Sequence, residues 1–205
     1  THGVSLTEAT LLFNVPSALA ASVSVFLTGW IAEKVVKRRP NAIAWLPALG
    51  LIVCVPFYLV GFSAENKWVA LAGICTGAAL KYGYIAAQYT IGQGVVGIRS
   101  RATATAILLF IVNLLGYGAG PPFIGYLSEI LFNMQANAEG FAELARASCK
   151  GDALAGLAEA QQVFCRSADA KALQNSLLIT SVLYALPAVF FLLCVKTLQK
   201  YLVAK

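Results

Sequence analysis

The chain contains, at residues 99–129, the stretch RSRATATAILLFIVNLLGYGAGPPFIGYLSE. Between Arg101 and Glu129 this stretch carries no charged residue, and a helix needs about 20 apolar residues to cross a bilayer. The whole chain shares this character, because 59% of its 205 residues are hydrophobic and 12% are charged, whereas soluble domains carry about 25% charged residues. The sequence therefore predicts an all-α multi-pass membrane protein.

Five segments are long and apolar enough to span a membrane. We expect these spans, named first to fifth in chain order, at about residues 9–32, 42–63, 68–98, 102–131 and 172–196. Together they predict one transmembrane bundle over residues 1–205. Residues 133–171 are polar and alanine-rich, with two short amphipathic patterns, which predicts a loop that contains short helices.

The basic residues predict the orientation of the bundle. One side of the alternating spans carries nine lysines and arginines against the single acid Glu33, and such a side faces the cytoplasm. We therefore expect a cytoplasmic C-terminus, an external 133–171 loop and residence in the cell membrane, the inner membrane if the source is bacterial. The net charge of +6 reflects this bias rather than nucleic-acid binding. An external Thr1 further predicts that an N-terminal half and one more span precede this chain.

The cysteines divide between the expected loop and the spans. Cys149 and Cys165 lie in the loop, where an oxidising compartment would favour a disulfide over two separate thiols. Cys54, Cys75 and Cys194 lie in spans without histidine nearby, and we interpret them as small core residues. No pattern in the sequence predicts a metal or a cofactor.

Polar residues follow one face of three spans. The first span carries small and hydroxyl residues at helical spacing, which favours helix packing, with Asn14 as the exception that could line a cavity. The third and fourth spans carry further polar groups. The set expected to line a wet or substrate-filled cavity is Asn14, Lys81, Tyr84, Gln88, Asn113 and Tyr117.

The remaining features concern packing. The fourth span concentrates glycine and proline, and we expect helix bending or a close crossover at Gly116, Gly118, Gly120, Pro121 and Pro122. The second and fifth spans are mostly bulky and aliphatic, with few polar groups. They are expected to be peripheral and to face lipid.

Two motifs resemble spinster-type transporters of the major facilitator superfamily. Residues 99–129, with RATA and a G-x-G-x-GP-x-x-x-G pattern, resemble the eleventh helix of that family, and GWIAEKVVKRR at residues 29–39 resembles the superfamily loop after the eighth helix. The resemblance covers nearly the whole chain as helices eight to twelve, the C-terminal half of a major facilitator-type bundle. In the loop motif Glu33 stands for the usual aspartate and Val36 for the usual glycine.

The resemblance implies a proton-coupled, alternating-access carrier of lysophospholipid, sphingolipid-like or other amphipathic anions, with protons and the missing N-terminal half as partners. It implies a cytoplasmic gate, formed here by Glu33, Lys34, Arg38, Arg99 and Arg101. No acid lies inside a span away from its ends, so a proton-coupling carboxylate is expected in the missing half.

Lys81 is the only charged residue deep inside the expected spans, away from their ends. It could anchor an anionic substrate, pair with a carboxylate of the missing half, or lie neutral in the apolar interior, and an intramembrane charge is functional by default. A carrier for a drug or a sugar acid is the nearest alternative. A channel or structural subunit suits the glycine-proline helix and the loop motif less well, and a membrane enzyme is disfavoured because no catalytic cluster or nucleotide motif is present.

Overall fold

The computed structural model describes residues 10–39, 41–149, 154 and 156–202 of the chain. In these residues it contains helices and their connections without a strand, which confirms the all-α fold class. The N-terminal residues 1–9, with the predicted start of the first span, and the side chain of Arg38 lie outside the described part.

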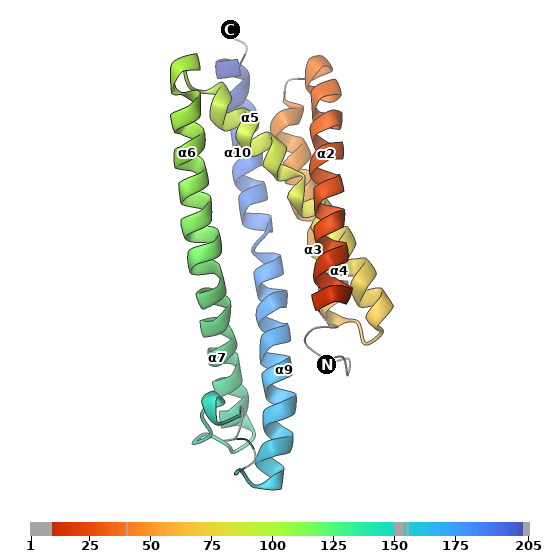
Figure 1. Cartoon of the computed structure of the whole chain (residues 1–205), viewed down its shortest axis with the longest axis vertical. Helices are drawn as coiled ribbons and strands as arrows, with labels where there is room; N and C mark the ends of the chain where they lie inside the picture. The colour runs from red at the N-terminus through yellow and green to blue at the C-terminus, as the bar shows by residue number, and fades with distance from the viewer. Residues whose placement is uncertain (1–9, 40, 150–153, 155, 203–205) are drawn as a thin grey trace. The chain divides into compact units, whose positions relative to one another are not determined.

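Figure 1 shows the helices in chain order. They are η1 (Thr10–Asn14), α2 (Val15–Arg38), α3 (Ala42–Ser63), α4 (Lys67–Tyr82), α5 (Tyr84–Gly94), η2 (Ile98–Ser100), α6 (Arg101–Val112), η3 (Asn113–Ala119), α7 (Gly120–Ala138), η4 (Arg146–Cys149), α9 (Glu159–Val182) and α10 (Ala185–Leu202). Five helical runs are long and apolar enough to cross a membrane: Thr10–Lys37, Ala42–Ser63, Lys67–Gly94, Ile98–Ala138 and Glu159–Val195. The last two extend well into the expected loop.

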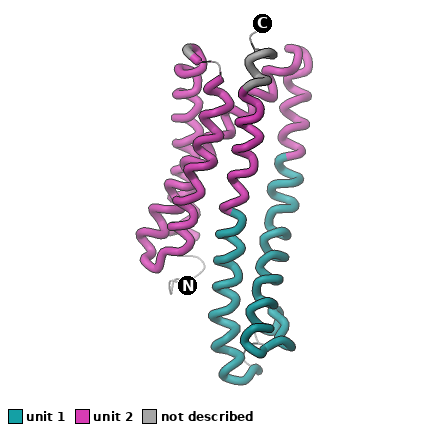
Figure 2. The backbone as a smooth tube through the Cα atoms, turned by 180° about the vertical axis from the view of Figure 1, so that it is seen from behind, with its two compact units in different colours: residues 1, 112–180 teal, residues 2–111, 181–205 magenta. Residues whose placement is uncertain are grey.

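The helices form two compact units, coloured separately in Figure 2. Unit 1 comprises residue 1 and residues 112–180, and unit 2 comprises residues 2–111 and 181–205. We describe each unit by itself.

Helix α3 is the central helix of unit 2. It contacts α4 and α10 extensively, and its buried residues run from Ala42 to Gly61 along most of its length. Ala48 and Leu51 form one core cluster with Ala188 of α10, and Ile43 and Ala44 form another with Ala87 of α5. The prediction that the second span is peripheral was therefore wrong, because an aliphatic face packs as well against helices as against lipid. Most large apolar side chains of α10, such as Phe190 and Leu193, are exposed, so the lipid-facing position of the fifth span stays a prediction.

Glycine brings α3 and α4 into close backbone contact. A Cβ placed on Gly73 would lie 2.7 Å from the Cα of Gly61, and one on Gly77 would lie 3.1 Å from the ring of Tyr58. Gly73 and Gly77 are one helical turn apart, the spacing at which small residues let membrane helices approach. The hydrophobic effect contributes little to helix association in apolar lipid, so this contact depends on the close fit of the two helix surfaces.

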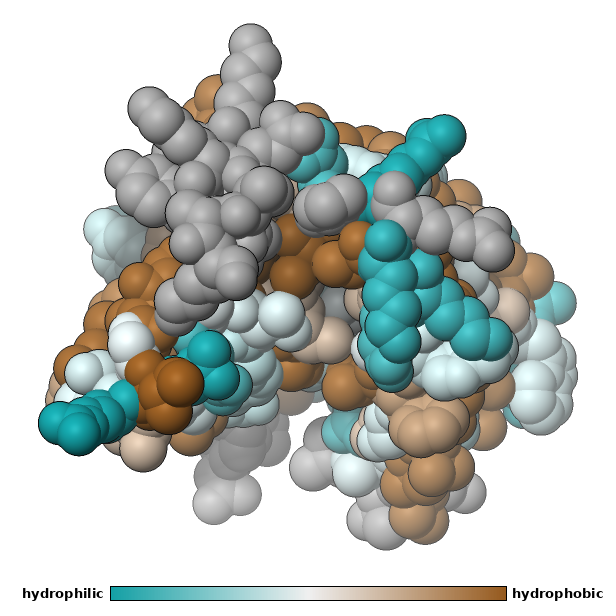
Figure 3. Space-filling view, turned by 90° about the horizontal axis from the view of Figure 1, so that it is seen from above, coloured by the Kyte–Doolittle hydropathy of each residue, from teal (hydrophilic) through white to brown (hydrophobic). Residues whose placement is uncertain are grey.

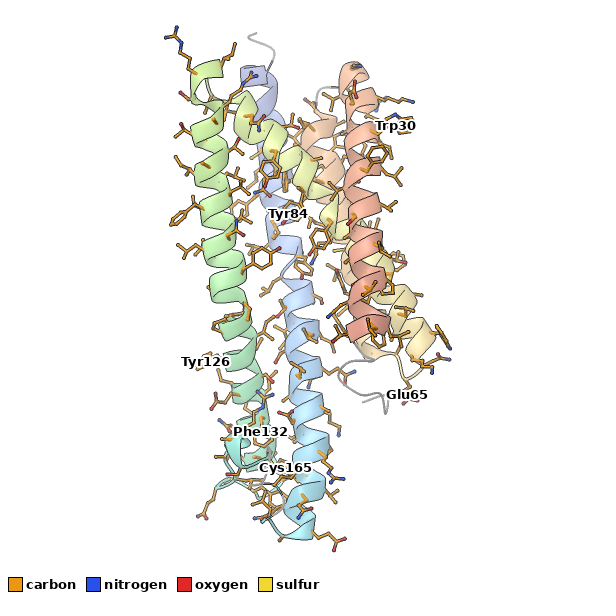
Figure 4. The ribbon with its side chains drawn as sticks, viewed as in Figure 1. Trp30, Glu65, Tyr84, Tyr126, Phe132 and Cys165 are labelled. Carbon is orange, nitrogen blue, oxygen red and sulfur yellow. A yellow bond between two sulfur atoms is a disulfide. The ribbon has the colours of Figure 1, made fainter. Side chains whose placement is uncertain are left out.

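Unit 1 holds a packed cluster where α7 ends. Gly140 has a positive φ of 81°, and the Phe141 N–H donates to the Ala136 carbonyl at 2.8 Å, which is a glycine-terminated helix end. The turn directs Phe141 onto Phe164, with ring centroids 4.8 Å apart, beside Phe132. Figure 4 shows Phe132 and Cys165 in this part of unit 1.

A disulfide and an ion pair connect the segment that follows α7, around residues 146–149, to α9. A disulfide joins Cys149 to Cys165, and Arg146 Nε donates to Asp169 Oδ1 at 2.5 Å. Cys165 is buried within the cluster. The segment thus packs on α9 through covalent, ionic and apolar contacts.

The glycine-proline stretch is irregular but unpacked. Gly116 and Gly118 lie in the π-helical η3, and Pro121 and Pro122 occupy the first turn of α7, where a missing N–H is tolerated. A Cβ on Gly116, Gly120 or Gly125 would meet no atom within 4 Å of the described chain. A close crossover at these glycines therefore remains a prediction.

The α3–α4 contact predicts that Gly73→Ala destabilises the protein by about 1–3 kcal/mol, because the added methyl group overpacks the Gly61 backbone. Gly116→Ala is the matched control, since it adds the same atom where nothing is in contact. Thermal unfolding of the purified complete protein, followed by size-exclusion fluorescence, measures both. Equal melting temperatures for the two variants would contradict the contact.

The disulfide predicts that Cys149→Ser lowers stability by about 3 kcal/mol, by releasing a loop with a sequence separation of 16 residues. The variant should be cleaved faster than wild type by an added protease within residues 141–158. Cys194→Ser, which removes an exposed free thiol, is the control. Indistinguishable cleavage of both variants would refute the expectation.

Candidate functional site

Three tyrosine rings surround the ammonium of Lys81 in unit 2. Its Nζ lies 4.6 Å from the ring centroid of Tyr82, 5.1 Å from that of Tyr184 and 5.7 Å from that of Tyr58. All three distances are within the roughly 6 Å at which a cation is attracted to an aromatic face. We call Tyr58, Tyr82 and Tyr184 the tyrosine cage.

The α3–α4 contact positions Tyr58. Its ring lies against Gly77, one turn before Lys81 on the same face of α4. The ring also stacks on Phe62 at 5.6 Å and meets Tyr184 at 5.7 Å between centroids. Tyr58 is therefore held by contacts that do not depend on Lys81.

A break in the helix positions Tyr184. Pro187 has no N–H to donate to the Leu183 carbonyl, which instead accepts from the Leu186 N–H at 3.0 Å, while the Tyr184 N–H donates to Ser181 at 3.2 Å. Leu183 and Tyr184 thus form a turn between α9 and α10. Within unit 2, this turn brings the Tyr184 ring to Lys81.

A second break follows Lys81 directly. Gly83 separates α4 from α5, and its N–H donates to the Lys81 carbonyl rather than to Ala79 four residues earlier. The hydroxyl of Ser24 on α2 donates to the Ala79 carbonyl instead. Beside it, a Cβ on Gly83 would lie 3.0 Å from the Thr28 hydroxyl oxygen. The small and hydroxyl residues of the first span thus pack against the helix break at Gly83, and one of them provides a hydrogen-bond donor for the Ala79 carbonyl.

The charge environment of Lys81 is unusual for an intramembrane lysine. Such residues normally pair with acids or carbonyls, yet neither ion pair found among the described residues involves Lys81. Attraction to an aromatic face contributes about 0.5–2 kcal/mol per ring, more where water is excluded. The cage stabilises the ammonium without neutralising it.

An apolar cavity of about 290 Å³ lies between α2, α3 and α4. Leu80 and Gly83, one residue before and two residues after Lys81 in the chain, contribute to its wall, as do Ser24 and Thr28. Lys81 and the cage tyrosines are not among the residues that line it. The cavity is of the size that accepts part of a small ligand.

Two solved structures have a similar fold. The chain matches the crystal structure of a bacterial homolog of the human lysosomal transporter spinster, inward-facing and unoccupied, with a TM-score of 0.84 and 33% identity over 97% of this chain and 42% of that one. The inward-facing, occupied form gives a TM-score of 0.81 and 33% identity, over 99% and 43% of the two chains. The chain is a spinster-like member of the major facilitator superfamily.

A curated relative agrees with this assignment. An MFS-type efflux pump of Mycolicibacterium smegmatis (strain ATCC 700084 / mc(2)155) is 25% identical over 131 residues, which are 64% of this chain and 30% of the pump. No protein-family model matches the chain. The spinster-like chain spans less than half the length of each of these relatives.

The predicted cavity-lining residues of the spinster-like chain fall in different places. Tyr84, labelled in Figure 4, begins α5 and packs against the Ala48–Leu51–Ala188 cluster. Gln88 is partly buried one turn further along α5, and Asn14 is exposed at the end of η1. Asn113 and Tyr117 belong to unit 1, in η3, with Tyr117 74% exposed. Of the predicted set, Lys81 is the residue whose ammonium the cage rings surround.

The sequence analysis missed Tyr58 and Tyr184 because both lie in spans that were expected to face lipid. Two signals could have found them. Gly73, Gly77 and Lys81 share one face of a helix at four-residue spacing, and a tyrosine is an uncommon choice for an aliphatic, lipid-facing helix interior.

Figure 3 shows hydrophilic side chains that project beside hydrophobic surface in the view from above. Glu33 accepts from Lys37 Nζ at 2.9 Å within α2, and Lys34 Nζ lies 3.6 Å from the Trp30 ring centroid. Arg99 in η2 and Arg101, the first residue of α6, are exposed. The described contacts of Glu33 and Lys34 are thus local, and their gating role remains a prediction.

The bond from Ser24 to the freed carbonyl predicts that Ser24→Ala destabilises the protein by about 1 kcal/mol, by leaving a part-buried acceptor unsatisfied. Ser22→Ala is the matched control, because the exposed Ser22 hydroxyl donates only to Ala18 of its own helix. Melting temperatures of the two variants compare them directly. A larger loss for Ser22→Ala would contradict this account of the break.

Proposed function

We propose that this spinster-like transporter chain belongs to a secondary carrier that moves an amphipathic organic anion, such as a lysophospholipid or a sphingolipid-like phosphate. The observation that carries the proposal is Lys81, an ammonium held within unit 2 by neutral rings and by no carboxylate among the described residues. In a medium of low dielectric constant such a charge attracts an anion far more strongly than it would in water.

The site offers a donor set suited to a phosphate or carboxylate. Lys81 has three N–H donors, and the hydroxyls of the cage tyrosines can donate as well. The apolar cavity of about 290 Å³ beside Leu80 and Gly83 could hold part of an acyl chain. Helix breaks at Gly83 and Tyr184 flank the site, and transporters commonly bind substrate at interrupted helices.

The coupling and the orientation are part of the same proposal. None of the nine acids of the sequence lies inside an expected span away from its ends, so proton coupling would use a carboxylate of the partnering half. Alternating access would rock the two halves about the substrate, with Glu33, Lys34, Arg38, Arg99 and Arg101 at a cytoplasmic gate. The C-terminus would be cytoplasmic and the protein would reside in the cell membrane.

Export of an apolar drug is a second candidate function. The similarity to an MFS-type efflux pump and the mainly aliphatic wall of the cavity support it. The two candidates differ in their need for Lys81, since a neutral hydrophobic compound gains nothing from a buried ammonium.

Lys81→Met is expected to reduce uptake of anionic lysophospholipid into proteoliposomes by at least about tenfold, because it removes the cation and keeps the bulk of the side chain. Lys67→Met, at the exposed start of α4, is the control and should leave uptake unchanged. The complete protein is assayed with and without a proton gradient.

Undiminished lysophospholipid uptake by folded Lys81→Met protein would overturn the anion proposal. Lysine-independent export of a neutral hydrophobic compound would support the second candidate instead. Equal uptake with and without a proton gradient would contradict the proposed proton coupling.

A further inference from the structure

The tyrosine cage has the composition of a binding site for organic cations. Proteins recognise quaternary ammonium groups by enclosing them among aromatic faces. Here the enclosed cation is the side chain of Lys81 itself, with ring centroids at 4.6 Å, 5.1 Å and 5.7 Å from its Nζ. The rings come from α3, from α4 and from the turn before α10.

We propose that Lys81 is a tethered occupant of a latent organic-cation site, and that it excludes cationic headgroups from the tyrosine cage while it presents its own charge to anions. The anion part rests on the proposed function. The latent cation site stands on the geometry of the cage alone.

Two of the three cage rings, Tyr58 and Tyr184, are held by contacts that do not involve Lys81. Gly77 and Phe62 hold the Tyr58 ring, and Tyr58 in turn meets the Tyr184 ring at 5.7 Å. The turn caused by Pro187 fixes the backbone of Tyr184. Removal of the lysine side chain should therefore leave the rings in place, with an opening between them.

The presence or absence of the Lys81 ammonium in the cage decides whether the site favours an anionic or a cationic ligand. While the ammonium of Lys81 fills the cage, a second cation would face both the loss of the ring faces and repulsion by a like charge in a medium of low dielectric constant. Without the ammonium, the same faces attract a cation. Lys81 is thus expected to determine specificity as well as to bind.

Choline binding to the purified complete protein tests the inference by isothermal titration calorimetry. Lys81→Ala should bind choline at least about tenfold more tightly than wild type, because a cation on desolvated rings gains strongly. Lys81→Arg is the matched control and should behave as wild type, since a guanidinium still occupies the cage. 3,3-Dimethylbutan-1-ol has the shape of choline without its charge and should not bind to Lys81→Ala.

Substitutions of Tyr184 in the Lys81→Ala variant distinguish binding to aromatic faces from nonspecific filling of the space left by the lysine side chain. Adding Tyr184→Leu should weaken choline binding at least about tenfold, whereas adding Tyr184→Phe should preserve it because the aromatic face remains. Lys81→Ser replaces Lys81→Ala if the alanine variant does not fold.

Absence of choline binding by a folded Lys81→Ala or Lys81→Ser protein would overturn the inference, as would equal binding of 3,3-dimethylbutan-1-ol. Choline binding is measured without transport, so its failure leaves the anion proposal untouched. Conversely, anion uptake that is unchanged in Lys81→Met would contradict the anion proposal without contradicting the latent cation site, which choline binding tests separately.

Discussion

The backbone contact between Gly61 and Gly73 is the constraint on which unit 2 depends. Because a methyl group at Gly73 would lie 2.7 Å from the facing Cα, only glycine allows α3 and α4 to lie this close. The same approach lays Tyr58 on Gly77, and helical geometry then places Lys81 one turn further along the same face. Helix packing and the chemistry of the site therefore have a common origin.

Two interruptions of the helices meet this packed pair. In a membrane every freed carbonyl needs a partner from the protein, and unit 2 supplies one at each break. The Ser24 hydroxyl donates to the Ala79 carbonyl where Gly83 ends α4, and the Leu186 N–H donates to the Leu183 carbonyl in the turn between α9 and α10. The breaks are thus tolerated, and they turn Tyr184 and the end of α4 toward each other within the unit.

The sequence predicted the all-α class and five apolar runs, because length and hydropathy are local properties. The functional role of Lys81 stays a prediction. It did not predict that α3 is central, since an aliphatic helix looks the same whether lipid or protein surrounds it. Tyr58 and Tyr184 were missed for that reason. Asn113 and Tyr117 were grouped with Lys81 by polarity, and the structure assigns them to the other unit.

A carboxylate beside Lys81 would hold the ammonium tightly, because opposite charges attract strongly in a medium of low dielectric constant. An arriving anion would then have to displace that partner and leave it buried and unpaired. Aromatic faces avoid this difficulty, since their attraction is weaker and carries no net charge. An anion can therefore bind the ammonium without displacing an ion-pair partner. No buried charge of the cage is left unpaired when the anion binds. A cage of neutral rings thus suits a lysine that must bind and release a substrate repeatedly.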